Sequence, residues 1–168
     1  MRVFKYSLAG FMLVSLGAWG DLSDHSDHDA HAAHQNELHI MQGWVRALPP
    51  TQKVTAAYLT LHNAGSTKLI VNRFSSEISD RVELHDSVLK DGQMRMQRLE
   101  SLALAADQHQ ELAPGGLHLM LMDLESMPRE GETVSVCVAS DEIESCARLP
   151  VLRSAPQSMD AMPHHNHH

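Results

Sequence analysis

The chain has 168 residues, the size of a single domain. It carries 21 acidic and 13 basic residues, a formal net charge of −8 with neutral histidines, and no cluster of basic residues. This balance argues against binding to nucleic acid or to an anionic lipid surface, because both recognise clustered positive charge.

Residues 1–20 have the form of a secretory signal peptide, with Arg2 and Lys5 before the short apolar run 8–16 and small residues after it. The run is short for a membrane span, and no cysteine stands at the junction to carry a lipid anchor. An uncleaved membrane anchor is the alternative. Cleavage removes two positive residues and no acid, which changes the charge from −8 to −10. We therefore expect a periplasmic protein without stable membrane insertion after cleavage.

Residues 21–37 form a histidine-rich segment that lacks β-branched residues and is expected to be disordered when free. Its histidines recur every third residue, so one helical turn would gather them on one side. Histidine-rich tracts are typical of metal binding, and the alternative is a soluble acidic spacer. The candidate secondary ligands are His25, His28, His31 and His34.

The folded domain is expected over residues 38–152, as roughly eight or nine short strands about ten residues apart. Turn signals such as Asn63-Ala64-Gly65-Ser66 and the hairpin pair Asp91-Gly92 separate them. No segment predicts a long amphipathic helix. The pattern favours an all-β sandwich or barrel with Greek-key connections. The expected strands are residues 39–46, 55–62, 68–74, 81–89, 93–99, 117–124, 132–139 and 143–152, with shorter segments at 102–104 and near 111–112.

Cys137 and Cys146 are the two cysteines of the chain. If Asp141-Glu142 is a two-residue hairpin loop, the cysteines face each other on paired strands, which favours a disulfide in an exported protein. Their spacing does not fit a redox or metal site of the CxxC type.

Residues 153–168 are polar and expected to be flexible, and they end in a histidine run. A cloning tag is one explanation for this run. The interruption at Asn166 and the preceding methionines favour a native metal-binding tail instead. Its candidate ligands are Met159, Met162, His164, His165, His167 and His168.

The stretch 114–122 begins with the turn residues Pro-Gly-Gly and continues as a predicted strand. Side chains alternate along a strand, so His118 and Met120 share one face while leucines occupy the other. Imidazole and thioether donors together favour copper, and Cu(I) above all. Methionine is also a common core residue, so the stretch alone leaves both interpretations open.

His85 and Met96 are the candidate partners for His118 and Met120. The hairpin at Asp91-Gly92 brings His85 and Met96 into one neighbourhood. A set of two histidines and two methionines is neutral, and it has no thiolate that could be oxidised. Zn²⁺ prefers nitrogen, oxygen and thiolate donors, so the thioethers favour Cu(I).

The spacing of these residues resembles that of the PCuAC family of periplasmic copper chaperones. In that family a His, ten residues, a Met, twenty-one residues and His-x-Met form the site, and this chain reproduces the pattern. Trp44-Val45-Arg46, Ala56-Ala57-Tyr58 and Pro114-Gly115-Gly116 are also similar to family segments. The resemblance covers about residues 38–152. The cysteine pair is not part of the family pattern.

The resemblance implies a cupredoxin-like fold and a Cu(I) site formed by His85, Met96, His118 and Met120. It also implies delivery of copper to the CuA site of cytochrome oxidase, directly or through a thiol-bearing assembly factor. The histidine-rich tails would capture Cu(II). The alternative function is periplasmic copper storage or detoxification. No catalytic set stands out, so we expect a monomeric binding protein and not an enzyme.

Five further residues have weaker assignments. Met94 and Met122 share strand faces with proposed ligands, and either pack around the site or take part in transient transfer. His62 and His109 are interpreted as ordinary surface residues, and His39 as an extension of the N-terminal tract.

Overall fold

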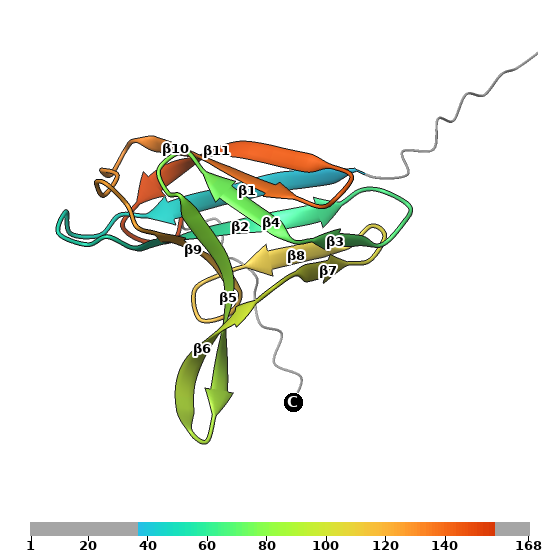
Figure 1. Ribbon diagram of the computed structural model, residues 1–168, viewed down its shortest axis with the longest axis horizontal. Coiled ribbons are helices and arrows are strands. Elements are labelled where there is room, and N and C mark those ends of the chain that lie inside the picture. The colour runs from blue at the N-terminus through green and yellow to red at the C-terminus, as the bar shows by residue number, and fades with distance from the viewer. Residues whose placement is uncertain (1–36, 157–168) are drawn as a thin grey trace, which may run out of the picture. The chain divides into compact units, whose positions relative to one another are not determined.

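The computed structural model describes residues 37–156 (Figure 1). The predicted signal peptide, the N-terminal histidine tract and the histidines of the C-terminal tail lie outside these residues. Within the described part of the chain, no helix has the length and apolarity that crossing a membrane requires.

Eleven strands make up the described domain, and hydrogen bonding arranges nine of them in one sheet (Figure 1). The main path through this sheet is β4-β10-β11-β1-β2-β9-β5-β6, and β8 also pairs with β2. β3 and β7 form a separate two-stranded sheet. The strands are β1 (Leu38–Arg46), β2 (Thr55–Asn63), β3 (Leu69–Val71), β4 (Arg73–Ser76), β5 (Arg81–Lys90), β6 (Gln93–Leu99), β7 (Leu102–Leu104), β8 (His109–Leu112), β9 (His118–Met122), β10 (Thr133–Ala139) and β11 (Glu144–Leu152).

One apolar core lies between these strands, and its residues come from both sheets. Leu59, Leu119 and Leu121 are fully buried, and they alternate with residues that face away from the core. The burial of the two leucines of β9 confirms the predicted alternation along this strand. The opposite face of β2 and β9 is therefore available for polar and sulfur-containing side chains.

The prediction of an all-β domain is confirmed, and most strand positions agree with the expected ones. The sheet is open, with β4 and β6 at the ends of its main path, and does not close into a barrel. The single strand expected over residues 68–74 is wrong. The chain breaks at Asn72, where β3 pairs with β7 and β4 pairs with β10. A switch of partner strands between two sheets has no signal in the local hydrophobic pattern.

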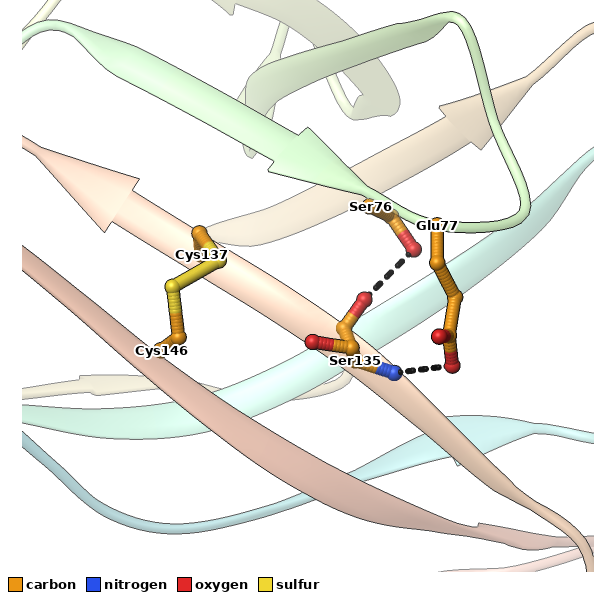
Figure 2. Close-up of a disulfide and its surroundings, with 5 residues drawn as sticks. All are labelled: Ser76, Glu77, Ser135, Cys137 and Cys146. Atoms are coloured by element: carbon orange, nitrogen blue, oxygen red, sulfur yellow. Dashed lines mark hydrogen bonds between the residues drawn. A yellow bond between two sulfur atoms is a disulfide. The ribbon is translucent and has the colours of Figure 1, made fainter.

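A disulfide joins Cys137 and Cys146 across the β10–β11 hairpin (Figure 2). The two residues are direct partners in the strand register, as the two-residue loop predicts. On the other side of β10, Ser76 Oγ donates to Ser135 O at 2.9 Å, and Ser135 N donates to Glu77 Oε1 at 2.7 Å (Figure 2). The disulfide and these bonds tie β10 to both of its neighbours.

Gly43 on β1 determines how closely β1 packs against β2. A Cβ atom on Gly43 would lie 2.6 Å from Tyr58 O, so a larger residue would push the strands apart.

Asn63 is fully buried at the end of β2. Its amide donates to the carbonyl oxygens of Thr67, Leu104 and Ala105, and its Oδ1 accepts from Gly65 N. These bonds confirm the predicted turn after β2 and join it to β7.

Candidate metal centre

The pairing of β5 with β9 places His85 directly opposite His118. Their ring centroids are 6.0 Å apart. Two imidazoles bound to one ion have centroids about 5–6 Å apart, because metal–nitrogen bonds are about 2.0–2.1 Å. Met120 follows on the same face of β9, opposite Glu83. The structure therefore brings three of the four sequence-predicted ligands, His85, His118 and Met120, onto one surface.

Hydrogen bonds orient both imidazole rings. His118 Nδ1 lies 2.9 Å from Gly116 O, and His85 Nε2 lies 2.9 Å from Glu83 Oε2. In each pair the ring N–H must donate, because a carbonyl or carboxylate oxygen only accepts. In the neutral form of each ring, the lone pair is then on His118 Nε2 and on His85 Nδ1. The His85 Nδ1 atom is buried and has no hydrogen-bond partner. Histidine ligands commonly donate their second ring N–H in this way.

The loop between β8 and β9 supplies the carbonyl that holds His118. Both strands pair with β2, β8 with residues 59–62 and β9 with residues 55–57, so the loop projects where they meet. Gly115 has a φ of +85°, which glycine adopts without strain. Gly116 N donates to Ala113 O, and Gly116 O also accepts from Ser87 N on β5. The predicted Pro-Gly-Gly turn thus connects both histidine-bearing strands.

An aromatic cluster borders the site. The rings of Trp44 and Tyr58 lie 4.7 Å apart, and the Tyr58 ring lies 6.3 Å from that of His118. Trp44 and Tyr58 are almost completely buried, and Met120 packs against them with Ala56. The cluster covers one side of His118 and part of Met120. An apolar surround of this kind controls solvent access and the local dielectric at a metal site.

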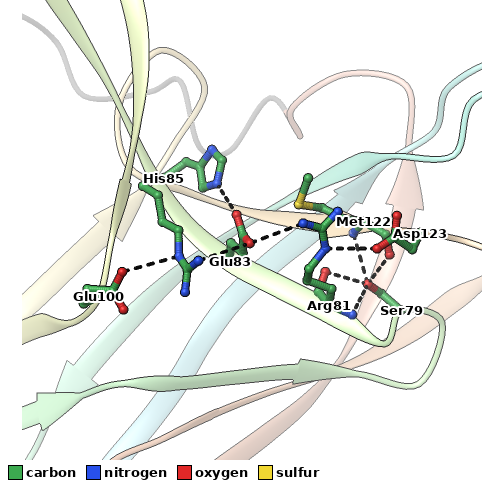
Figure 3. A network of polar contacts seen from close by, with 8 residues as sticks. Ser79, Arg81, Glu83, His85, Glu100, Met122 and Asp123 are labelled. Carbon is green, nitrogen blue, oxygen red and sulfur yellow. Dashed lines mark hydrogen bonds and ion pairs between the residues drawn. The ribbon is translucent and has the colours of Figure 1, made fainter.

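Glu83 is the centre of a charged network beside His85 (Figure 3). Its Oε1 lies 3.7 Å from Arg81 and 3.6 Å from Arg98, while its Oε2 accepts from His85. The hydrogen bond from His85 holds the pKa of Glu83 below its ordinary value of 4.5, and the two arginines act in the same direction against the effect of burial. Glu83 is therefore an ionised acceptor that orients His85.

Met96 is the sequence-predicted ligand that the structure does not bring into the cluster. It lies on β6 opposite Ser87, on the same face of the hairpin as His85 but diagonal to it, and is 61% exposed. Met94 and Leu89 are also exposed near the tip of this hairpin. The 60% exposure of Met94 does not favour packing around the site, one of two roles considered for this residue. The hairpin instead presents a soft, apolar surface to solvent.

The other candidate residues have different outcomes. Met122 lies on β9, where it pairs with Arg81 of β5. It is half-buried and lies on the same face of β9 as Met120. Cys137 and Cys146 lie near Glu144, but the disulfide removes both thiols as metal ligands. The secondary ligands predicted in the N-terminal tract and in the C-terminal tail lie outside the described residues.

Sequence reasoning missed Glu83 as a functional residue. Its signal was present, because residues two apart on a strand share a face, and Glu83-Leu84-His85 places a carboxylate beside the imidazole. Trp44 and Tyr58 were noted only as parts of family-like segments. Their contact with each other depends on the pairing of β1 with β2.

Comparison with known proteins places the chain in a family. Residues 38–145 match the family model described as "Putative lipoprotein LpqE-like". A curated relative, "Putative lipoprotein Lxx21020" of Leifsonia xyli subsp. xyli, is 34% identical over 116 residues, which is 68% of this chain and 69% of that protein.

Solved structures of copper-protein domains have a similar fold. The solution structure of CuI-DR1885 from Deinococcus radiodurans aligns with a TM-score of 0.56 and 23% identity, covering 73% of this chain and 83% of that one. The copper-bound PCuAC domain from PmoF2 aligns with a TM-score of 0.56 and 18% identity, covering 72% and 95%. These matches confirm the resemblance to PCuAC domains inferred from the ligand spacing. The chain is therefore a member of the LpqE-like family, with the fold of a PCuAC domain.

Proposed function

We propose that this protein is a periplasmic copper chaperone that carries Cu(I) at His85, His118, Met120 and Met96. The observation that supports this proposal most directly is the buried Nδ1 atom of His85, which has no hydrogen-bond partner. His85 is on the face of the β5–β9 pair that also carries His118 and Met120. An unpaired buried polar atom is costly, and a metal ion would satisfy it.

The donor set determines which metal is carried. Two neutral imidazoles and thioether sulfur match a soft monovalent cation, and Cu(I) fits this description. The set binds Cu(I) without burying an unpaired negative charge, since Glu83 is balanced by Arg81 and Arg98. Copper is cargo in this proposal. We therefore propose a binding function rather than an enzymatic one.

The exposed position of Met96 suits delivery. A carrier must release its cargo to a partner, and ligands at an accessible edge can be exchanged one at a time. In this proposal the β5–β6 hairpin turns Met96 toward His85 when Cu(I) binds, and turns it away when a partner's ligand replaces it. Met94 and Leu89 would then contact that partner. The receiving partner is proposed to be the CuA site of cytochrome oxidase or a thiol-bearing assembly factor.

The remaining parts of the chain complete the proposal. Residues 1–20 would direct export, residues 38–152 would carry the Cu(I) site as a monomer, and the segments 21–37 and 153–168 would capture Cu(II) near it. Tethered ligands raise the local copper concentration without any new contact in the domain.

X-ray absorption on the Cu(I)-loaded protein tests the site. The full chain is used with the histidines of the N-terminal tract and of the C-terminal tail changed to asparagine, and with Met159 and Met162 changed to leucine. We expect nitrogen and sulfur in the first coordination shell, and loss of sulfur in a Met96→Leu/Met120→Leu variant. Met94→Leu is the matched control, because Met94 has the same exposure on the same hairpin, and it should retain the sulfur signal. A shell of nitrogen and oxygen that neither variant changes would refute the site.

A further inference from the structure

Three histidines from three neighbouring strands lie in one row at the end of β2 remote from the candidate Cu(I) site. His62 on β2 pairs directly with His39 on β1 and with His109 on β8. β1 and β8 lie beside β2 in the same sheet (Figure 1). Sequence spacing gave no reason to group these residues, because they are separated by 23 and 47 positions along the chain.

The three rings lie near one another, but they are not at the spacing of three imidazoles around one ion. The His39 and His62 centroids are 6.3 Å apart, and the His62 and His109 rings are stacked at 3.8 Å. A shared ion requires centroid distances of about 5–6 Å, given metal–nitrogen bonds of about 2.0–2.1 Å. To bind one ion, the distance between the His39 and His62 rings must shorten, and the distance between the His62 and His109 rings must lengthen. The outer two histidines have room to rotate, since the His39 side chain is 45% exposed and His109 is exposed.

Carboxylates orient two of the three rings. His62 Nε2 lies 3.0 Å from Asp107 Oδ1, and His39 Nε2 lies 2.7 Å from Glu37 Oε1. As at His85, the ring N–H donates to the carboxylate, and in the neutral form of each ring Nδ1 then carries the lone pair that can bind a metal. Asp107 has a positive φ of 56°, a conformation that glycine adopts more easily. Aspartate at this turn provides the carboxylate that a glycine would lack.

We propose that His39, His62 and His109 form a second metal site, which favours Cu(II). Three imidazoles with oxygen donors nearby suit a borderline divalent ion, and the Irving–Williams order places Cu²⁺ above Zn²⁺. The site contains no thioether, so it has the opposite preference to the Cu(I) site. This inference does not depend on the proposed function.

The position of this second site fits uptake from the N-terminal tract. His39 stands five residues after His34, so the connecting chain spans at most about 18 Å. The second site and the candidate Cu(I) site occupy the same face of the sheet, because His62 and Tyr58 are four residues apart on β2. That separation corresponds to roughly 13 Å along the strand.

The test uses the full-length chain with its eight tract and tail histidines changed to asparagine, which leaves five internal histidines. Copper(II) sulfate is added without reductant. Backbone amide NMR locates the ion by paramagnetic broadening, and spin-echo electron paramagnetic resonance counts the bound imidazoles. We expect broadening centred on His39, His62 and His109, with more than one imidazole bound.

Variants assign the site to these residues. His62→Asn should weaken Cu²⁺ binding by at least about 100-fold, and Asp107→Asn by about 10-fold through loss of ring orientation. Glu111→Gln is the matched control for charge, because it lies on β8 facing Thr60 and outside the row, and should bind normally. His109→Asn provides the same test at an exposed position if His62→Asn does not fold. Both histidine variants should retain Cu(I) binding, which keeps this test separate from that of the proposed function.

Two results would overturn the proposal. Broadening centred on another part of the domain would place the ion elsewhere. Cu²⁺ affinity within twofold of the parent in both His62→Asn and His109→Asn would mean that the histidine row serves only the packing of β1, β2 and β8.

Discussion

Replacement of Glu83 by glutamine should weaken Cu(I) binding although Glu83 does not bind the ion itself. The carboxylate uses Oε2 to accept from His85 and directs Oε1 toward Arg81 and Arg98. Glutamine has one acceptor oxygen and cannot satisfy both sides. If the amide NH₂ faces the histidine, His85 Nε2 must accept, and the ring proton moves to Nδ1. That proton would block the nitrogen proposed as the ligand.

The expected loss is about 10–100-fold in Cu(I) affinity, the usual effect of removing a residue that orients a metal-bound histidine. This corresponds to roughly 1.4–2.7 kcal/mol at 1.36 kcal/mol per tenfold change. Competition with a chromogenic Cu(I) chelator measures the affinity. ¹⁵N chemical shifts of the imidazole report the tautomer of His85 in the copper-free protein.

Glu100→Gln is the matched control for this prediction. It removes the same charge from a residue that contacts Arg98 at 3.6 Å but is 84% exposed. Its Cu(I) affinity should stay within about twofold of wild type, since a solvent-exposed ion pair contributes little. Equal affinities for Glu83→Gln and Glu100→Gln, with an unchanged His85 tautomer, would refute the orienting role of Glu83.

The same residue has a pH signature in the copper-free protein. Because the folded-state pKa of Glu83 is lowered, the ionised carboxylate stabilises the fold at pH values above its ordinary pKa of 4.5. This contribution is lost as the pH falls through the lowered value. The difference in unfolding free energy between wild type and Glu83→Gln should therefore be constant near neutral pH and decrease in acid. A difference that grows as the pH falls below 4 would contradict the assignment.

Three further predictions concern stability. The Cys137→Ser/Cys146→Ser variant should lose roughly 3 kcal/mol, given the sequence separation of 9, and its Tm should fall by roughly 10 °C. A fall of less than 3 °C in thermal unfolding would contradict this. Asn63→Ala should cost about 2–4 kcal/mol in urea unfolding, because three carbonyl groups lose the donor that the buried Asn63 amide supplies. Gly43→Ala should cost about 1–3 kcal/mol through overpacking against the neighbouring strand. Gly116→Ala is the control and should be close to neutral, because the nearest atom to its added Cβ lies 3.9 Å away. Equal costs for the two variants would refute the close-approach argument.

Several features of the site could be predicted because they depend on residues close in the chain. His118 and Met120 share a face through the two-residue period of a strand. The register of the β10–β11 hairpin follows from its short loop, and it places Cys137 opposite Cys146. Turn chemistry likewise located Asn63. In each case, the local backbone geometry determines the answer without reference to distant segments.

Other features depend on pairing between distant strands. β11 runs parallel to β1 at Val45 and Val151, and no loop length or local pattern encodes this contact. Met96 lies on β6, at the end of the main sheet path, and β5 separates β6 from β9. The position of Met96 relative to His118 therefore depends on three strands. Spacing along the chain identified Met96 as a candidate, but it gave no information about its distance from His118.

The position of His39 shows most clearly what only the tertiary structure determines. Simple alternation along β1 places His39 and Trp44 on opposite faces, because they are five residues apart. A register shift between Ile40 and Gln42 reverses this, so His39 pairs with His62 while Trp44 pairs with Tyr58 on the same face. The sequence by itself determined an all-β chain with soft ligands on one strand face. The bulge and the pairing of β2 with both β1 and β8 decided that three other histidines meet, because one additional residue in a strand moves every following side chain to the other face.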